Sequence, residues 1–493
     1  MEKIKSKCQE IICDKNLYIF SIITMIFWGA FCIMQYAPDT YDVFTNGVKN
    51  SVLHFFTCGR YITGIALIFA MRILNLGNKG IYYLSYIFAI ICTIISLYRL
   101  NKLIKKEIKN EILSIVITTI ILINPFSIEL YMYIEKGIMV LSVLLCVLAV
   151  EQMVEFFDGN KKSSIYALIL MIIANSCYQG TVGLFVSISL IYILKYSKNI
   201  KEFIKNNVIV ALTYGIPAIL NFLSVRFLFT NARVNGNMIL SESIKKVIDG
   251  TKNMLTETYG LLPENLFLIA IYIIVALIIY KAIKDKCSTK QKILKIAGAF
   301  YIIAGTIFAT VAPQILQDTN SIWFVARSSY PMAAIIGLLL LYLCFKFDIN
   351  IIEKNIMIIF TIVFMIIQFI NFMQFIIDNY IGNYLDRQVT LEIKSYIEDY
   401  EKETKNTIDS ICIYHDKATK YVYDNLKASG DMNIRGYSAD WCIPKILEFY
   451  TGRKLEVLEA NVELKEIFSQ NNWDKFKEEQ IIFDNNIMHL CIY

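Results

Sequence analysis

The sequence predicts a mainly α-helical, polytopic membrane protein that ends in a small α/β domain. Of its 493 residues, 56% are hydrophobic and only 18% are charged, whereas soluble domains average about a quarter charged residues. Long apolar runs recur through the first three quarters of the chain and then stop. This pattern excludes a single soluble globule, a disordered chain and a small disulfide scaffold.

Membrane-spanning helices are expected wherever about 20 mostly apolar residues can cross about 30 Å of hydrocarbon. About 11 stretches approach this length. They lie near residues 17–36, 80–98, 111–124, 137–152, 164–178, 181–195, 208–229, 266–281, 296–312, 331–346 and 355–376. The first run has no small-residue cleavage site after it, so we do not expect a cleavable signal peptide.

Residues 61–76 form a shorter apolar stretch that contains Arg72. If this stretch crossed the membrane, the basic loop at 99–111 would lie outside, against the positive-inside rule. We therefore expect residues 61–76 to form a helix that lies along the outer interface.

The distribution of Lys and Arg then predicts the orientation. The predicted cytoplasmic segments hold more than twice as many of these residues as the predicted outer loops. The cytoplasmic segments are the N-terminal tail and residues 99–110, 153–163, 195–207, 281–295 and 346–354; the outer loops are 37–79, 124–136, 230–265 and 313–330. We expect a multi-pass protein of the bacterial cell membrane, with a cytoplasmic N-terminus and an extracytoplasmic C-terminal domain.

The sequence divides into two predicted domains. Residues 1–376 form a transmembrane domain with outer-face loops at 37–79 and 230–265, and residues 377–493 form an extracytoplasmic α/β domain. Within the second domain, hydrophobic patterning and turn residues predict six elements. These are a charged helix at 386–405, a strand at 409–416, a helix at 439–452 ended by Gly452, and strands at 454–460, 479–485 and 486–493, the last two joined as a hairpin across Asn485 and Asn486.

Several function classes lack their sequence motifs. There are three histidines, no CxxC, and no GxxxxGK[ST], GxSxG or HExxH. ATP-driven transport, serine hydrolysis and zinc proteolysis therefore have no support. We predict no metal site and no nucleic-acid partner. No cofactor is implied with certainty, and a divalent cation stays open.

The loop after the first predicted span holds two acids, Asp39 and Asp42. Three residues apart, they would share one face of a helical turn. Partial loss of hydration at the bilayer edge would favour the protonated form of a carboxyl group, which suits a general base. The alternative is that they cap a helix over residues 40–50. Asp42 fits that role better, and Asp39 is the better candidate for the base.

Three further polar clusters fall on the same predicted side of the membrane. They are NPFSIELYMYIEKG (124–137), with Glu129, Glu135 and Lys136; NSCYQGT (175–181), with Tyr178 and Gln179; and WFVARSSYPMA (323–333), with Arg327. Interfacial anchoring explains each cluster taken alone. Their shared side favours one common site, in which Arg327 could bind a phosphate with both arms of its guanidinium group.

Acids, a phosphate-binding arginine and a long apolar body suit a substrate that is itself half lipid, such as a polyprenyl phosphate carrying a sugar. The base would deprotonate an acceptor hydroxyl, which would attack the anomeric carbon while the phosphate leaves. Arginine or lysine would stabilise the charge that develops on that phosphate. A single displacement of this kind inverts the anomeric centre.

Four short motifs resemble the bacterial type II glucosyltransferases, polytopic membrane enzymes of the GT-C class. The motifs are APDTYD…GR from Asp39 to Arg60, the NPF…Y turn from Asn124 to Tyr133, the Tyr178–Gln179 turn, and Arg327 before a late span; the resemblance covers roughly residues 15–380. It implies a GT-C-type fold and transfer of a hexose, with glucose expected, from a polyprenyl-phosphate sugar to a cell-surface glycan or glycolipid. It also implies a catalytic acid in the first outer loop, hence Asp39, with Asp42 second.

This sequence departs from the family pattern at two places. The family's two adjacent acids are separated here by Thr40 and Tyr41, and its acid in the second loop is replaced by Lys136, with Glu135 one residue earlier. Which acid acts as the base therefore stays open. The predicted site residues are Asp39, Asp42 and Glu135 for catalysis, Arg327, Arg60 and Lys136 for the donor phosphate, and Tyr178, Gln179, His54 and Tyr133 for substrate binding.

Two other functions remain as alternatives. A polysaccharide polymerase, or another transferase of lipid-linked sugars, would use similar acids and arginines. A transporter of lipid-linked sugars would place ionisable groups near the bilayer midplane. The middle of the predicted spans is nearly free of charge, which favours an enzyme.

Overall fold

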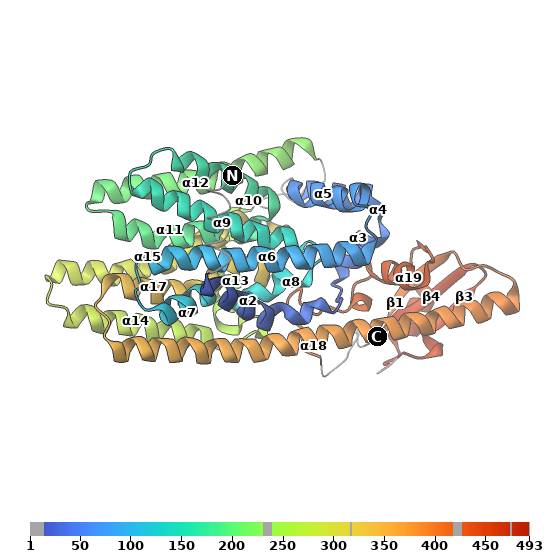
Figure 1. The fold of residues 1–493 in the computed structure, drawn as a ribbon. Helices are drawn as coiled ribbons and strands as arrows, with labels where there is room; N and C mark the ends of the chain where they lie inside the picture. The colour runs from blue at the N-terminus through green and yellow to red at the C-terminus, as the bar shows by residue number, and fades with distance from the viewer. Residues whose placement is uncertain (1–13, 230–238, 316–317, 418–425, 474–475, 493) are drawn as a thin grey trace. The chain divides into compact units, whose positions relative to one another are not determined.

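The computed structural model describes residues 14–229, 239–315, 318–417, 426–473 and 476–492. The chain is mainly α-helical, with one small sheet near its C-terminus (Figure 1). Its contacts divide it into two compact units. Unit 1 comprises Met1–Cys32 and Val52–Phe372, and unit 2 comprises Ile33–Ser51 and Met373–Tyr493.

Long apolar helices make up most of unit 1. Among the described residues, eight helices are long and apolar enough to cross a membrane, and a bent pair would make a ninth. The eight are α2 (Lys15–Trp28) with η1 (Gly29–Cys32), α6 (Asn78–Lys105), α9 (Lys136–Phe157), η4 (Gln179–Thr181) with α11 (Gly183–Tyr196), α12 (Ile200–Leu228), α14 (Leu266–Lys284), α15 (Thr289–Ile315) and α18 (Ile351–Thr404). Several lie side by side, as α6, α9 and α10 (Ser163–Cys177) do in Figure 1. These helices indicate a multi-pass membrane protein.

All eleven predicted stretches fall on helices, but three of them differ from simple spans. The stretch at 111–124 is half of the bent pair: α7 (Glu111–Leu122) meets η3 (Pro125–Ile128) and α8 (Glu129–Met132) at 57°. The bend falls where Pro125 cannot donate a backbone hydrogen bond, and the Asn124 side chain caps the new turn. The other two, α10 and α17 (Ile335–Lys346), are shorter than 18 residues.

Residues 61–76 form a short apolar helix, α5 (Tyr61–Ile68), continued by the π-helical turn η2 (Phe69–Ile73). Their location along a membrane interface stays a prediction. The remaining helical elements among the described residues are α3 (Pro38–Thr45), α4 (Gly47–Thr57), α13 (Leu240–Glu257), η5 (Thr258–Gly260), η6 (Thr319–Ser321), η7 (Ala326–Ser328), α16 (Tyr330–Ala333), η8 (Gly436–Ser438), α19 (Ile443–Thr451), α20 (Val462–Ser469) and η9 (Glu478–Gln480).

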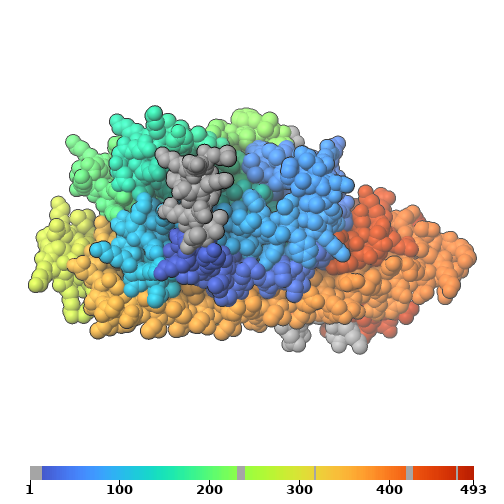
Figure 2. Space-filling model, viewed as in Figure 1, coloured from blue at the N-terminus to red at the C-terminus, as the bar shows by residue number. Residues whose placement is uncertain are grey.

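Unit 1 exposes apolar side chains along whole helices. Ile22 and Ile26 of α2 are 62% and 54% exposed, and Ile359 and Ile370 of α18 are similarly open. Side chains of both helices cover the face shown in Figure 2, in dark blue and light orange. Soluble proteins rarely expose apolar patches of this extent, so these faces are suited to contact with hydrocarbon.

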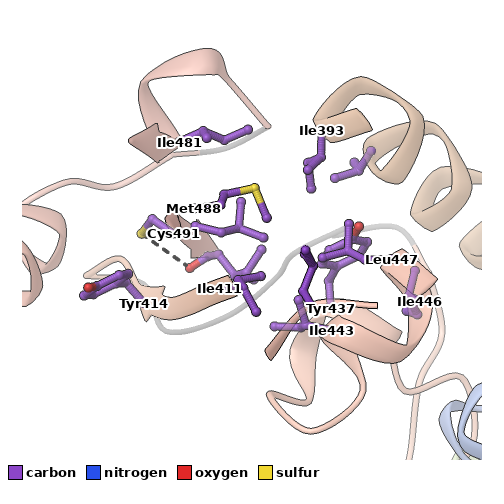
Figure 3. Packing of buried hydrophobic residues seen from close by; sticks show 14 of the residues in the cluster. Ile393, Ile411, Tyr414, Tyr437, Ile443, Ile446, Leu447, Ile481, Met488 and Cys491 are labelled. Atoms are coloured by element: carbon purple, nitrogen blue, oxygen red, sulfur yellow. Dashed lines mark hydrogen bonds between the residues drawn. The ribbon is translucent and has the colours of Figure 1, made fainter. Parts of the chain in front are cut away.

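Unit 2 contains a four-stranded sheet in the order β2-β1-β4-β3. The central strand β1 (Ser410–His415) is parallel to β2 (Glu456–Val457) and β4 (Ile487–Ile492), whereas β3 (Ile481–Asp484) is antiparallel to β4. Figure 3 shows Ile411 and Met488 of the sheet gathered with Ile393 of α18 and with Ile443 and Leu447 of α19.

Most of the elements predicted for the C-terminal region are confirmed. The strand at 409–416 and the final hairpin are present, and α19 ends at Gly452, whose φ of 74° suits a glycine. The predicted strand at 454–460 is reduced to the two residues of β2, and α20 was not predicted. The charged helix at 386–405 is continuous with the apolar run at 355–376, because no proline interrupts α18.

Candidate functional site

The first half of the candidate site is an arginine held by a buried glutamate. Arg327 lies in η7, and Glu129 begins α8 and is fully buried. The Glu129 carboxylate accepts a hydrogen bond from the Arg327 backbone nitrogen at 2.6 Å and forms an ion pair with its guanidinium group. The same guanidinium group donates to the Tyr133 hydroxyl, and its central carbon lies 4.2 Å from the centre of the Tyr133 ring. These contacts fix the η7 turn and the direction of the Arg327 side chain.

A second arginine completes the site. Arg60 directly precedes α5, and its Nη1 lies 3.2 Å from Oε1 of Glu135, the residue before α9. The Arg60 guanidinium carbon lies 4.8 Å from the centre of the Tyr178 ring. The Nε of Arg60 is buried and has no hydrogen-bond partner among the described residues. Arg60 therefore has one guanidinium nitrogen whose hydrogen bond the described residues do not satisfy.

Arg60 and Arg327 line one cavity of about 100 Å³. The other lining residues are Tyr178, Gln179, Gly180, Thr310, Pro313, Gln314, Ser321, Trp323, Val325 and Ser328. The phenol hydroxyl of Tyr178 can act as a hydrogen-bond donor.

Glycine allows the Tyr178–Gln179 turn to approach Arg327. A Cβ atom on Gly180 would lie 2.9 Å from the Arg327 carbonyl oxygen and 2.9 Å from the Cα of Ser328. Both distances are too short for a Cβ atom, so only glycine fits at this position. The Gln179 side chain donates to the Cys58 carbonyl oxygen at 3.1 Å, close to Arg60 in the sequence. This turn therefore brings the two arginine-bearing segments to the same place.

Five of the predicted site residues come together in this way: Arg60, Arg327, Tyr178 and Gln179 line the cavity, and Glu135 is paired with Arg60. Tyr133 lies behind Arg327, buried against it. Two other residues do not line the cavity. Lys136 is fully buried, with its Nζ 3.7 Å from the centre of the Tyr82 ring, and His54 is exposed on α4 beside Phe55. Their roles in binding stay predictions.

Asp39 and Asp42 belong to unit 2, on α3, which packs against α19. Asp39 is exposed in the first turn, and Asp42 contacts Asn46 and lies 3.9 Å from the Lys445 ammonium nitrogen. The expected helix over 40–50 is divided into two: α3 begins at Pro38, because proline favours the first helical position, and ends at Thr45, and α4 begins at Gly47. Asp39, rather than Asp42, is therefore the acid that interacts with the helix N-terminus.

Sequence reasoning missed several residues of this site. Glu129 was not selected although it lies in the predicted 124–137 cluster, because its burial depends on the bend before α8. Trp323 and Gln314 also line the cavity. Trp323 lies four residues before Arg327 in the sequence. A tryptophan so close to a candidate phosphate ligand could have been predicted to contact a sugar. Among the described residues, no group of three His, Cys, Asp or Glu side chains is placed to hold a metal ion.

Comparison of the chain with protein-family models, curated proteins and solved structures gives no match.

Proposed function

We propose that this chain is a GT-C-type membrane glycosyltransferase that moves a hexose, with glucose expected, from a polyprenyl-phosphate donor to a cell-surface glycan or glycolipid. The observation that carries the proposal is that two guanidinium groups from distant segments, Arg60 and Arg327, line one cavity. Guanidinium groups bind phosphate with two parallel hydrogen bonds, and each good contact adds geometric specificity.

The rest of the cavity supports a sugar next to that phosphate. Its wall carries hydroxyl and amide groups, including those of Gln179, Thr310 and Gln314, and a half-exposed Trp323. Such side chains hydrogen-bond to hydroxyls and stack on apolar sugar faces. The surrounding long apolar helices would accept the polyprenyl tail.

In the proposed reaction, the acceptor hydroxyl gives its proton to a carboxylate and attacks the anomeric carbon. The bond between that carbon and the phosphate oxygen breaks, and the electron pair leaves with the polyprenyl phosphate. Arg327 and Arg60 stabilise the charge of the leaving phosphate. Asp39, on α3 of unit 2, is the base that the sequence predicts, and Glu135, beside Arg60, is the candidate within unit 1.

The proposal includes the predicted topology of eleven spans, with the cavity, the loops at 37–79 and 230–265 and the C-terminal domain on the outer face. Burial of the acidic partners Glu129 and Glu135 near one end of α8 and α9 is consistent with a site where charged headgroups meet the hydrocarbon. Transfer of a sugar from a polyprenyl phosphate needs no nucleotide, in keeping with the missing nucleotide-binding motifs.

The test is sugar transfer by the purified protein in lipid nanodiscs, with radiolabelled polyprenyl-phosphate hexoses and candidate acceptors. We expect Asp39→Asn to lower transfer by at least about 100-fold, the usual contribution of a general base, with normal expression and membrane insertion. Asp42→Asn is the matched control on the same helix, and its loss should stay below tenfold. Normal transfer by Asp39→Asn with a strong loss in Glu135→Gln would move the base to Glu135. Transfer from no polyprenyl-phosphate sugar would refute the proposal.

A further inference from the structure

Helix α13 in unit 1 has an apolar face that is only half covered by protein. Ser243, Val247 and Met254 are buried, where the helix packs against α14 and α15. The adjoining positions Leu240 and Ile248 are 53% and 61% exposed. A helix wholly surrounded by water would not place large apolar side chains beside its buried face in this way.

The exposed apolar side chains form a continuous stripe. Leu240, Ile244 and Ile248 follow one another at intervals of four residues, so they lie above each other on the helix. The exposed charged residues Lys245 and Asp249 lie on the adjoining face, about 100° round the helix from Ile244 and Ile248. An apolar stripe bordered by a charged face is the pattern of a helix that lies in a membrane interface.

The same helix holds one wall of the cavity. The Thr319 hydroxyl accepts a hydrogen bond from the Ile239 backbone nitrogen at 2.8 Å and lies 3.0 Å from the Ser243 hydroxyl. The Lys246 ammonium group donates to the Thr319 carbonyl oxygen at 3.0 Å. A Cβ atom on Gly250 would lie 2.4 Å from the Phe324 ring, so the helix and this segment are in close contact. The segment from Thr319 to Phe324 supplies Ser321 and Trp323 to the cavity.

The stripe continues a surface that is already suited to hydrocarbon. Helix α14 follows α13 in the chain and packs against it, and its Ile269, Tyr272 and Ile273 are about half exposed. Helix α14 is among those long and apolar enough to cross a membrane. Continuity with this face favours lipid, rather than another protein, as the occupant of the stripe.

We propose that α13 lies in the bilayer interface, with Leu240, Ile244 and Ile248 among the acyl chains, and that it thereby fixes the Ser321–Trp323 wall of the cavity at the membrane surface. The partner is the lipid surface itself, and the inference does not depend on the sugar chemistry. A lipid-linked substrate would then meet the cavity at the depth of its own headgroup.

Tryptophan fluorescence in vesicles tests this proposal. The full-length protein is reconstituted in phosphatidylcholine with or without brominated acyl chains, which quench tryptophans that they contact. We expect the fluorescence added by Ile248→Trp to fall at least twofold in brominated vesicles. The fluorescence added by Asp249→Trp, one residue away on the charged face, should change little.

Leu240→Trp with its neighbour control Ser241→Trp repeats the comparison if Ile248→Trp does not fold. If the tryptophans added at Ile248 and Leu240 are not quenched, the proposal is overturned and protein covers the stripe. Equally strong quenching within each pair would also overturn it, because the charged face would then lie among the acyl chains as well. Because no activity is measured, either outcome is separate from a failure of the proposed glycosyltransferase function.

Discussion

The two ends of unit 1 differ in how deeply the acids of their ion pairs are buried. Near the cavity, each ion pair joins an arginine to a glutamate that is almost inaccessible: the side chains of Glu129 and Glu135 are 0% and 7% exposed. At the other end, lysines pair with acids that are about a quarter to a third exposed, and Arg99 pairs with Glu151, whose side chain is 12% exposed. The lysine pairs are Lys15–Glu111, Lys105–Glu111, Lys195–Glu107, Lys281–Glu353 and Lys295–Asp285. The two ends are separated by helices such as α11, which begins beside Gln179 and carries Lys195 in its last turn.

Buried and exposed ion pairs differ in their energetic cost and in their effect on stability. Burying an ion pair removes both charges from water, and this penalty can exceed the attraction between them. Exposed pairs contribute little to stability and are screened by salt. The exposed lysine pairs are ordinary surface contacts, whereas the buried Arg–Glu pairs beside the cavity are better explained by a need for oriented guanidinium groups there.

The largest expected effect comes from breaking a buried pair. Arg327→Ala leaves the fully buried Glu129 carboxylate without its cation, so we expect a loss of about 3–5 kcal/mol in the free energy of unfolding. Denaturant unfolding in detergent micelles measures this loss. The control is Lys195→Ala at the other end, for which we expect less than about 1 kcal/mol. Equal losses in the two variants would remove the contrast between the two ends.

A milder variant tests the use of Arg327 in the reaction. Arg327→Lys keeps a positive charge near Glu129 but loses the planar fork that matches a phosphate. We expect about a tenfold loss in kcat/KM for the donor, equivalent to about 1.4 kcal/mol, with little change in the KM of the acceptor. Steady-state transfer kinetics separate these quantities. A rise in acceptor KM alone would argue against contact with the donor phosphate.

Unit 2 contains a buried ionisable side chain that has no ion-pair partner in the described contacts and stays neutral, in contrast to the ion pairs of unit 1. His489 on β4 is 6% exposed, and its Nδ1 lies 2.8 Å from the Tyr414 hydroxyl. Burial lowers the pKa of His489, and Asp484 opposes this in part. Because the unfolded chain takes up a proton at about pH 6.5 and the folded chain resists it, unfolding should become easier as the pH falls below 6.5.

This smaller effect is measured by thermal unfolding of the full-length protein at pH 7.5 and 5.5. Between pH 7.5 and pH 5.5, we expect the melting temperature of His489→Asn to fall by less than that of the wild-type protein. An unchanged drop in the variant would assign the pH dependence to other groups.

The fold was predictable where hydropathy alone decides it. Every apolar run became a helix, because backbone groups in hydrocarbon must bond within their own segment. The length of α18 was not predictable in this way. Its apolar part stops near residue 376, but the polar turns that follow contain no helix-breaking proline and pack Val389 and Ile393 into the core of unit 2.

The site was predictable only in part. Arg60, Tyr178 and Arg327 were recognisable as charged or aromatic residues at the ends of predicted spans. Glu129 was not, because a glutamate in an apolar turn is identified as a partner only once the bend before α8 places it under Arg327. Asp39, the predicted base, lies in unit 2 with the α3 helix, an assignment that no spacing in the sequence could give.

The central claim is that Arg60 and Arg327 bind the phosphate of a lipid-linked donor. The most direct measurement is photolabelling of the reconstituted protein with a radiolabelled, photoreactive polyprenyl phosphate, followed by mapping of the labelled peptides. The account predicts label on the segments around Tyr178 and Trp323, with a loss of at least tenfold in Arg60→Gln and none in Lys195→Gln. Equal labelling of both variants, or label confined to the lysine-rich end of unit 1, would contradict it.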